Sequence, residues 1–397
     1  MAGGITTPAG FKVAGIAAGI KASGAPDLAL IVPDRPASAA ALFTTNQVQA
    51  APVTVSREHL QKSGGRVSGV LVNSGCANAC TGSSGLAVAR ATADRLATTL
   101  QCPPDQVLVA STGVIGVGLK REIVEAGIAR AVDALARDGH PAARAIMTTD
   151  LGPKEAAAHV ETADGAFAVG GMAKGAGMIE PMLATMLAFV TTDASVEPSV
   201  LARALNEAVA TTFNAITVDG ECSTNDTIVA LASGASGVTV TDARNYPALV
   251  SGLTAVCRTL ALMIVRGGEG ATKLVSIKVT GADSVSSARQ VAKTIANSPL
   301  VKTAVHGGDP NWGRLVAAAG RSGAPFAIER ALVRVGPVVL FKDGQPYDEA
   351  APQAAEYLRG SNIDIEIDVG SGGTAEATVW TCDLSAEYVR INGEYRT

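Results

Sequence analysis

The chain is organised around one glycine-rich stretch, residues 174–187, which reads KGAGMIEPMLATML. A lysine stands among glycines, a proline follows, and one hydroxyl residue, Thr185, lies in the apolar segment after it. A threonine between alanine and methionine most often fills a core strand. It can also be a nucleophile that attacks the carbonyl of Ala184, so that water splits the chain and Thr185 becomes a new N-terminus. Its freed α-amine, with a pKa of about 7.7–8.0, would then serve as the base for the hydroxyl.

Composition bounds the class of protein. The length of 397 residues predicts two domains or one large α/β body. Hydrophobic residues make up 47% and charged residues 17%, which favours a large core of small side chains. Aromatic residues are only 4% and the net charge is −4, so we expect no nucleic-acid partner.

Several features of the sequence predict a cytoplasmic protein. No apolar run approaches the roughly 18–20 residues of a membrane helix, so we expect no membrane partner. The N-terminus lacks the basic and then apolar pattern of a signal peptide. Six scattered cysteines do not form a disulfide framework. Cys76 and Cys80 have no second ligand pair, and the four histidines are far apart, so we expect no metal site.

Short strands and amphipathic helices alternate through both halves of the chain, which predicts an α/β or α+β class. The region 10–73 reads as strands and turns. Strands are expected at 28–32, 67–72, 107–110, 166–169, 187–191, 228–232, 275–279, 333–341, 363–369 and 377–381. Helices are expected at 86–100, 123–135, 142–150, 198–209, 249–260 and 284–296. The chain should end in a polar tail, 392–397.

One strand end stands out for its chemistry. Thr112 and Gly113 follow the strand 107–110, so a backbone N–H and a hydroxyl can point at one oxygen there. The glycines at 113, 116 and 118 do not have the spacing of a dinucleotide fingerprint.

Several segments together resemble the ornithine acetyltransferase (glutamate N-acetyltransferase) family over nearly the whole chain. They are 15–23, 73–82, 110–116, 145–150, 170–187, 223–227, 269–273, 306–314 and 383–397. The resemblance implies a precursor that cuts itself between Ala184 and Thr185 into an α chain, 1–184, and a β chain, 185–397. It further implies a heterotetramer of two chains of each kind, and the layered fold of the DmpA-type aminopeptidases, with sheets flanked by helices.

The activity implied is acetyl transfer from N2-acetyl-L-ornithine to L-glutamate in arginine biosynthesis. Thr185 would carry the acetyl group between the two substrates in a ping-pong reaction. Thr112 and Gly113 match the pair that stabilises the oxyanion. Residues that match the substrate contacts are Thr148, Lys174, Thr185, Glu269, Asn392 and Thr397. No cofactor is implied, although acetyl-CoA can be an alternative acetyl donor in the family.

Other functions stay open at this point. With water as acceptor, the same threonine would make an amidase or aminopeptidase. A non-catalytic metabolite-binding protein would stay uncut, and a transferase of a specialised pathway such as clavulanic acid biosynthesis would carry the same motifs. Six further motif residues have no assigned role, and we expect them in buried structural networks: Asp150, Asn225, Asp226, Asp309, Asn311 and Arg314.

Overall fold

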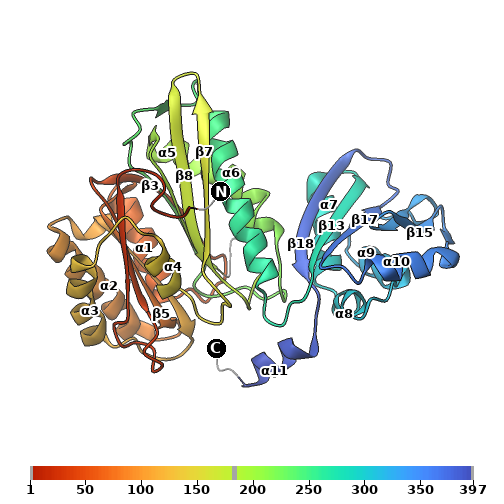
Figure 1. The fold of residues 1–397 in the computed structure, drawn as a ribbon, viewed down its shortest axis with the longest axis horizontal. Coiled ribbons are helices and arrows are strands. Elements are labelled where there is room, and N and C mark those ends of the chain that lie inside the picture. Colours follow the sequence, from red (N-terminus) through yellow and green to blue (C-terminus); the bar gives the residue numbers. More distant parts are fainter. Residues whose placement is uncertain (1–2, 181–185, 395–397) are drawn as a thin grey trace. The chain divides into compact units, whose positions relative to one another are not determined.

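The computed structural model describes residues 3–180 and 186–394 (Figure 1). They belong to two compact units, Met1–Asn214 with Glu221–Ile264 and Ala215–Gly220 with Val265–Tyr395. The division between the units therefore falls near residue 265. A cut between residues 184 and 185, as expected from the sequence, would fall within the first unit and not between the two units.

The first sheet of unit 1 carries the strand end singled out from the sequence. Its strands, in spatial order, are β1 (Phe11–Ile16), β2 (Leu28–Pro33), β5 (Gly69–Cys76) and β6 (Val107–Val114). β5 and β6 run parallel, so their carboxyl ends lie at one edge of the sheet. Thr112 and Gly113 lie at that end of β6.

Three helices cover one face of this sheet (Figure 1): α1 (Ala51–Lys62), α2 (Gly82–Leu100) and α3 (Arg121–Asp133). They share one apolar core with the strands, formed by residues that include Val55, Ala93, Leu96, Ile128, Leu30 and Leu71. The sequence did not predict α1, because its first turns contain β-branched residues that disfavour a helix. Pro52 in its first turn starts the helix, and burial of Val53 and Val55 stabilises it.

The second sheet of unit 1 packs face to face on the first, with α4 (His140–Ala145) sharing the core between them. Its strands, in spatial order, are β4 (Arg66–Val67), β3 (Ala37–Phe43), β11 (Thr227–Ala232), β9 (Leu187–Thr192), β8 (Gly165–Lys174) and β7 (Lys154–Thr162). Its outer face carries α5 (Pro198–Ala210), which lies against β3, and α6 (Tyr246–Arg266). Unit 1 is thus a four-layer α/β/β/α arrangement, and the predicted fold of sheets flanked by helices is confirmed.

Helix α6 corrects one expectation from the sequence. It is 21 residues long and, by length and composition, apolar enough to cross a membrane. Its apolar stripe covers the second sheet: Leu260 and Val256 lie beside Gly171 of β8, and Gly252 lies beside Val169. The glycines allow this close approach, because a Cβ at Gly252 would come within 2.7 Å of a valine methyl group of β7.

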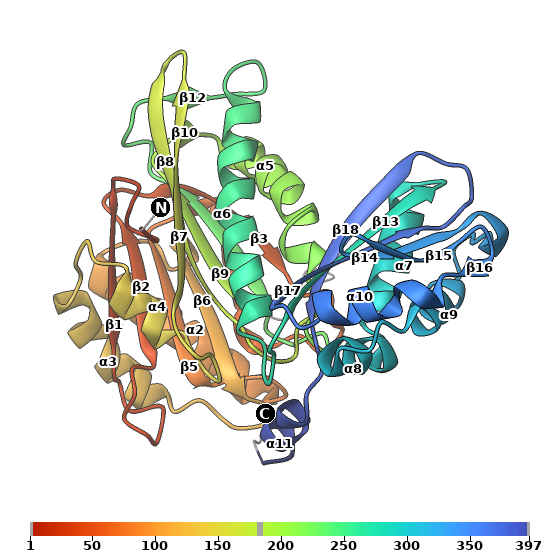
Figure 2. The ribbon, with the colours of Figure 1, turned by 45° about the vertical axis from the view of Figure 1, so that its right-hand side comes forward.

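Unit 2 is one mixed sheet with helices on it (Figure 2). The strand order is β16 (Gln345–Pro346), β15 (Val338–Lys342), β14 (Leu332–Val335), β17 (Asn362–Asp368), β13 (Leu274–Ala282) and β18 (Ala375–Cys382). In β17 the three isoleucines are buried and alternate with acidic residues that are less buried, which is the pattern of a strand covered on one face. The helices of this unit are α7 (Val285–Ala296), α8 (Pro299–Gly307), α9 (Trp312–Gly320), α10 (Ala351–Tyr357) and α11 (Ala386–Glu394).

Three predicted elements differ from those observed. The helix expected at 142–150 ends at Ala145, and a turn follows it. The strand expected at 333–341 is a hairpin, because Gly336 adopts a φ of +55° and Pro337 follows it. The expected tail is helical up to Glu394. Short pieces complete the described chain: a parallel ribbon of β10 (Ser195–Val196) and β12 (Thr239–Val240), and 3-10 turns at Pro104–Gln106, Phe213–Ala215, Ile328–Arg330 and Asp348–Ala350.

Candidate active site

Lys174, the last residue of β8, holds together the polar groups that the sequence singled out in unit 1. Its Nζ donates to Thr148 Oγ1 at 2.8 Å and to Thr112 Oγ1 at 3.2 Å. Lys174 is only 9% exposed, so these bonds form largely away from water. Thr112 comes from the first sheet, Lys174 from the second and Thr148 from the turn after α4. Face-to-face packing of the two sheets therefore brings the three residues together.

Gly113 is required by the backbone at this strand end. Its φ is +126°, and a Cβ there would lie 2.4 Å from the carbonyl carbon of Gly75, where the pairing of β5 and β6 shifts register. The neighbouring Thr112 hydroxyl accepts from Lys174, which leaves its own proton to be donated elsewhere. A hydroxyl donor next to a glycine backbone is the type of pair that stabilises an oxyanion.

Asp150 lies close to Lys174, and its side chain is fully buried. Oδ1 accepts from Lys154 Nζ at 2.5 Å and from the Gly175 N–H at 2.7 Å, and Oδ2 accepts from the Thr148 N–H at 3.1 Å. Burial opposes the charged form, but the Lys174 and Lys154 ammonium groups outweigh it, so the pKa of Asp150 lies below its ordinary value. The carboxylate is charged at neutral pH.

Lys21 is a second ammonium group at this site, and the sequence did not single it out. Its Nζ donates to the carbonyl oxygens of Met147 and Pro26, both at 2.8 Å. Burial lowers the pKa of Lys21, Lys174 lowers it further, and Asp27 opposes them. No local pattern marks Lys21, because its partners come from a distant turn and from the loop that Asp27 organises by accepting four backbone N–H groups.

A buried amide holds the carboxyl ends of β5 and β6 in place. Asn225 Nδ2 donates to the carbonyl oxygens of Ala77 at 2.6 Å and Ser111 at 2.8 Å, and Thr224 Oγ1 donates to Asn225 Oδ1. Asn225 thus fixes the residue before Thr112. Its expected place in a buried structural network is confirmed, and Asp226 beside it is also buried.

The unit 2 residues of the predicted site also meet within their own unit. Asn392 Nδ2 donates to Glu269 Oε2 at 2.9 Å, and Glu269 is 8% exposed. The loop after Glu269 packs tightly on α11, since a Cβ at Gly270 would lie 2.5 Å from the Tyr388 nitrogen. Asp383 fastens the same loop by accepting from the Thr272 and Lys273 N–H groups.

Three residues of the predicted site, Ala184, Thr185 and Thr397, lie outside the described residues. Thr185 precedes β9 by two residues in the sequence. β8 and β9 are antiparallel neighbours in which Lys174 pairs with Leu187, so the connection between them begins beside Lys174.

Comparison with known proteins settles the family. A profile of the ArgJ family matches residues 12–397. The chain is 50% identical to the arginine biosynthesis bifunctional protein ArgJ of a Synechococcus species, over all of this chain and 98% of that one. It is 47% identical to the protein of that name from Symbiobacterium thermophilum, over 100% and 99% of the two chains. The chain belongs to the ArgJ family.

A solved ArgJ-family structure agrees with this assignment. The crystal structure of the arginine biosynthesis bifunctional protein ArgJ from Bacillus halodurans is 42% identical, with a TM-score of 0.51. All of that chain is matched, by 53% of this one.

The C-terminal ArgJ-family motif 306–314 has structural contacts in this chain. Asn311 caps α9: its Oδ1 accepts from the Arg314 N–H at 3.1 Å, and its Nδ2 donates to Asp309. Arg314 donates to the Leu300 carbonyl oxygen. Asp309 is exposed, and Asn311 and Arg314 are half-buried, so these contacts are structural but do not form the buried network that we expected.

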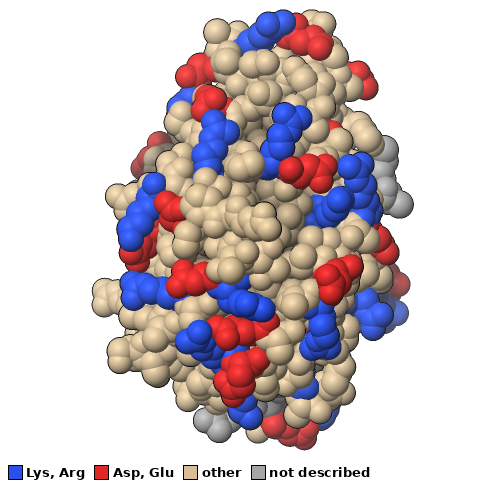
Figure 3. Space-filling model, turned by 90° about the vertical axis from the view of Figure 1, so that its left-hand side faces the viewer, with Lys and Arg blue, Asp and Glu red and all other residues tan. Residues whose placement is uncertain are grey.

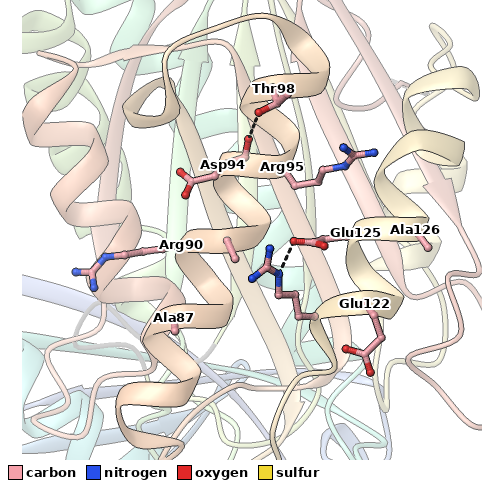
Figure 4. A pocket seen from close by; sticks show the side chains of 10 residues that line it. Ala87, Arg90, Asp94, Arg95, Thr98, Glu122, Glu125 and Ala126 are labelled. Atoms are coloured by element: carbon pink, nitrogen blue, oxygen red, sulfur yellow. Dashed lines mark hydrogen bonds and ion pairs between the residues drawn. The ribbon is translucent and has the colours of Figure 1, made fainter.

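A surface groove of about 690 Å³ lies between α2 and α3 (Figure 4). The α2 wall carries Arg90, Asp94 and Arg95, and the α3 wall carries Arg121, Glu122 and Glu125. Figure 3 shows basic and acidic side chains interspersed in the same way on the face that it draws. Among the described residues, no three His, Cys, Asp or Glu side chains are placed to hold a metal ion.

Proposed function

We infer that this chain is an acetyltransferase of arginine biosynthesis that moves the acetyl group of N2-acetyl-L-ornithine to L-glutamate. The products are L-ornithine and N-acetyl-L-glutamate. The observation that carries this inference is the identity of about one half, over its full length, to bifunctional arginine biosynthesis proteins. The cluster of Lys174, Thr148 and Thr112 supports it, because it joins a cation for a carboxylate to a donor for an oxyanion.

The chemical step proceeds in two matched halves. The hydroxyl oxygen of Thr185 attacks the acetyl carbonyl carbon while its own α-amine takes the hydroxyl proton. The oxyanion collapses, the C–N bond to ornithine breaks, and the leaving amine receives the proton. Glutamate then attacks the acetyl ester with its amine, and the Thr185 α-amine takes a proton from that amine. The C–O bond to Thr185 breaks, and this proton passes to the threonine oxygen. We assign stabilisation of both oxyanions to the Thr112 hydroxyl and the Gly113 N–H.

Substrate recognition requires groups of both signs, because each substrate is a zwitterionic amino acid or its acetylated form. Lys174 supplies the cation for the α-carboxylate, and Lys21 adds positive charge beside it. We assign Glu269 to the substrate ammonium group, with Asn392 holding one of its oxygens. Thr148, Thr185 and Thr397 complete the proposed contacts.

Self-cleavage before Thr185 would free the amine that acts as base. The ladder between β8 and β9 supports this proposal, because it would hold an α chain, 1–184, and a β chain, 185–397, together after the cut. The Bacillus halodurans chain supports it too: all of it is matched by 53% of this chain, close to the share of residues 185–397. We propose a cytoplasmic heterotetramer of two α and two β chains.

The relatives are called bifunctional, and for this chain we propose that the second activity is acetylation of glutamate by acetyl-CoA. No resident cofactor is required, since the acetyl group passes through Thr185.

The test is to incubate the purified protein with acetylornithine, with and without glutamate. We expect ornithine release that depends on glutamate, and two bands on a denaturing gel, the second beginning at Thr185. Thr185→Ala should run as one band and be inactive. Equal ornithine release without glutamate would instead indicate an amidase, and an uncut, fully active wild type would exclude the threonine mechanism.

A further inference from the structure

We propose that Asp150 is a positioning residue of the acetyl-transfer site, whose buried carboxylate holds Thr148, Lys174 and the start of the cleavage segment in place. The cleavage segment is residues 175–186, between β8 and β9. This inference rests on the proposed function, because it concerns the same reaction.

The three hydrogen bonds of Asp150 all come from donors that adjoin Thr148 or Lys174. One goes to the N–H of Thr148, whose hydroxyl accepts from Lys174. A second goes to the N–H of Gly175, the residue after Lys174. In the third, Lys154 Nζ donates to Asp150 Oδ1, and Lys154 pairs across the ladder with Ala173, the residue before Lys174. Asp150 therefore fixes the backbone on both sides of the lysine.

Charge explains why the position carries an acid. The three partners of Asp150 are all donors, and two ammonium groups, Lys154 and Lys174, lie close to it. The Lys154 side chain is only 5% exposed and that of Asp150 is 0% exposed, so water cannot replace the carboxylate as counter-charge. An asparagine of the same shape would leave two like charges facing each other in a buried place.

The same contact bears on self-cleavage. The Gly175 N–H bond fixes the first residue of the cleavage segment, and β9 fixes the residue after its end. Attack of the Thr185 hydroxyl on the Ala184 carbonyl depends on a restricted geometry, to which an anchored Gly175 contributes. Loss of one anchor should slow the cut.

The experiment compares Asp150→Asn with Asp193→Asn. Asp193 is a matched control: it is buried in the same unit and accepts from the backbone N–H groups of Ala168 and Ala9. It follows β9, at the end of the ladder opposite to Lys174. Readouts are the thermal midpoint, the rate of self-cleavage on denaturing gels, and kcat/KM for acetylornithine against pH.

Both variants should lose thermal stability, but only Asp150→Asn should change the chemistry. We expect its cleavage to slow and its KM to rise about 10- to 100-fold, because Thr148 and Lys174 are no longer held in place by the carboxylate. The alkaline limb of its pH profile should move about 1–3 pH units lower, because an ammonium without a neighbouring anion loses its proton more easily. Wild-type values of KM, limb and cleavage rate in Asp150→Asn would overturn the proposal.

Two further variants keep the test decisive if Asp150→Asn does not fold. Asp150→Glu retains the charge and should keep the alkaline limb near that of the wild type. Lys154→Met removes a neighbouring cation and should move the limb to higher pH, opposite in sign to Asp150→Asn. An alkaline limb that moves to lower pH in both Lys154→Met and Asp150→Asn would contradict the electrostatic role. If Lys174→Ala is also fully active, the proposed function itself fails; if it is inactive, only the role of Asp150 does.

Discussion

Two lysines, one in each unit, show how the partners of an ammonium group decide what it can do. Lys273 donates to the carbonyl oxygens of Val305 and Leu358 at 2.6 Å and to that of His306 at 3.3 Å. Lys174 donates to two threonine hydroxyls. A carbonyl oxygen only accepts, whereas a hydroxyl accepts and also donates onward. Lys273 therefore has a structural role, while Lys174 belongs to a series of hydrogen bonds that can continue through a threonine hydroxyl to a substrate.

The buried carboxylates of the two units repeat the contrast. Asp383 accepts from the Thr272 hydroxyl at 2.5 Å, from two backbone N–H groups and from His306 Nδ1 at 2.7 Å, which fixes one loop of unit 2. Asp150 accepts from groups on both sides of Lys174. Similar hydrogen bonding thus serves stability in unit 2 and, in our proposal, reactivity in unit 1.

The largest expected effect is a difference in kcat between substitutions at two threonines, Thr112 and Thr272. Thr112→Ala should lower kcat by about 100-fold with little change in KM, because the oxyanion loses one donor. Thr272→Ala removes a hydroxyl bound to Asp383 and should lower thermal stability while leaving kcat near that of the wild type. Kinetics of both variants, measured on cleaved enzyme, test this. Thr112→Ser should retain most of the rate; equal losses for Ala and Ser would show that the methyl group matters and the hydroxyl does not.

The two lysines should differ next. Lys174→Ala should lower kcat/KM by about 10- to 100-fold, chiefly through KM, because a hydrogen bond to a charged group contributes about 1.5–3 kcal/mol. Lys273→Ala should reduce the free energy of unfolding and leave KM unchanged. Urea unfolding together with steady-state kinetics distinguishes the pair. A large loss in the free energy of unfolding of Lys174→Ala would show that this lysine is structural, like Lys273.

Acid should weaken both units. The pKa of Asp150 is lowered because its lysine neighbours outweigh burial, and that of Asp383 is lowered because its hydrogen bonds from Thr272 and His306 do so. A carboxyl group with a lowered folded pKa stabilises the protein above its unfolded pKa of about 3.9, and this contribution is lost as the pH falls through the folded value. Urea unfolding between pH 6 and 3 should show the loss. The slope against pH should be shallower in Asp383→Asn, and an unchanged slope would count against the carboxylate.

The smallest effect is expected for a substitution in the α2/α3 groove. Arg121→Ala removes an exposed pair with Glu125 and should change the free energy of unfolding by less than about 0.5 kcal/mol, with no change in kcat or KM. A clear loss of activity would show that the groove takes part in the reaction.

Local patterns in the sequence predicted most elements, and the family resemblance supplied the candidate residues apart from Lys21. The strand 187–191 and the helix 284–296 follow directly from apolar runs and helical spacing. Helix α1 was missed because its β-branched first turns suit a strand, and tertiary burial outweighs that preference. The hairpin at Gly336 was read as one strand because a two-residue turn interrupts the apolar pattern very little.

By itself, the sequence determined the class of fold, the family and the list of polar motif residues, because each of these is written in short, contiguous stretches. Only the tertiary structure decided which of these residues contact one another. Thr112 is 62 residues from Lys174, and Lys21 is 126 residues from the Met147 carbonyl that it contacts. Such contacts depend on the register of β5 against β6 and on the packing of two sheets. Strand register and sheet packing are set by the summed burial of many side chains, which no single stretch of the chain contains.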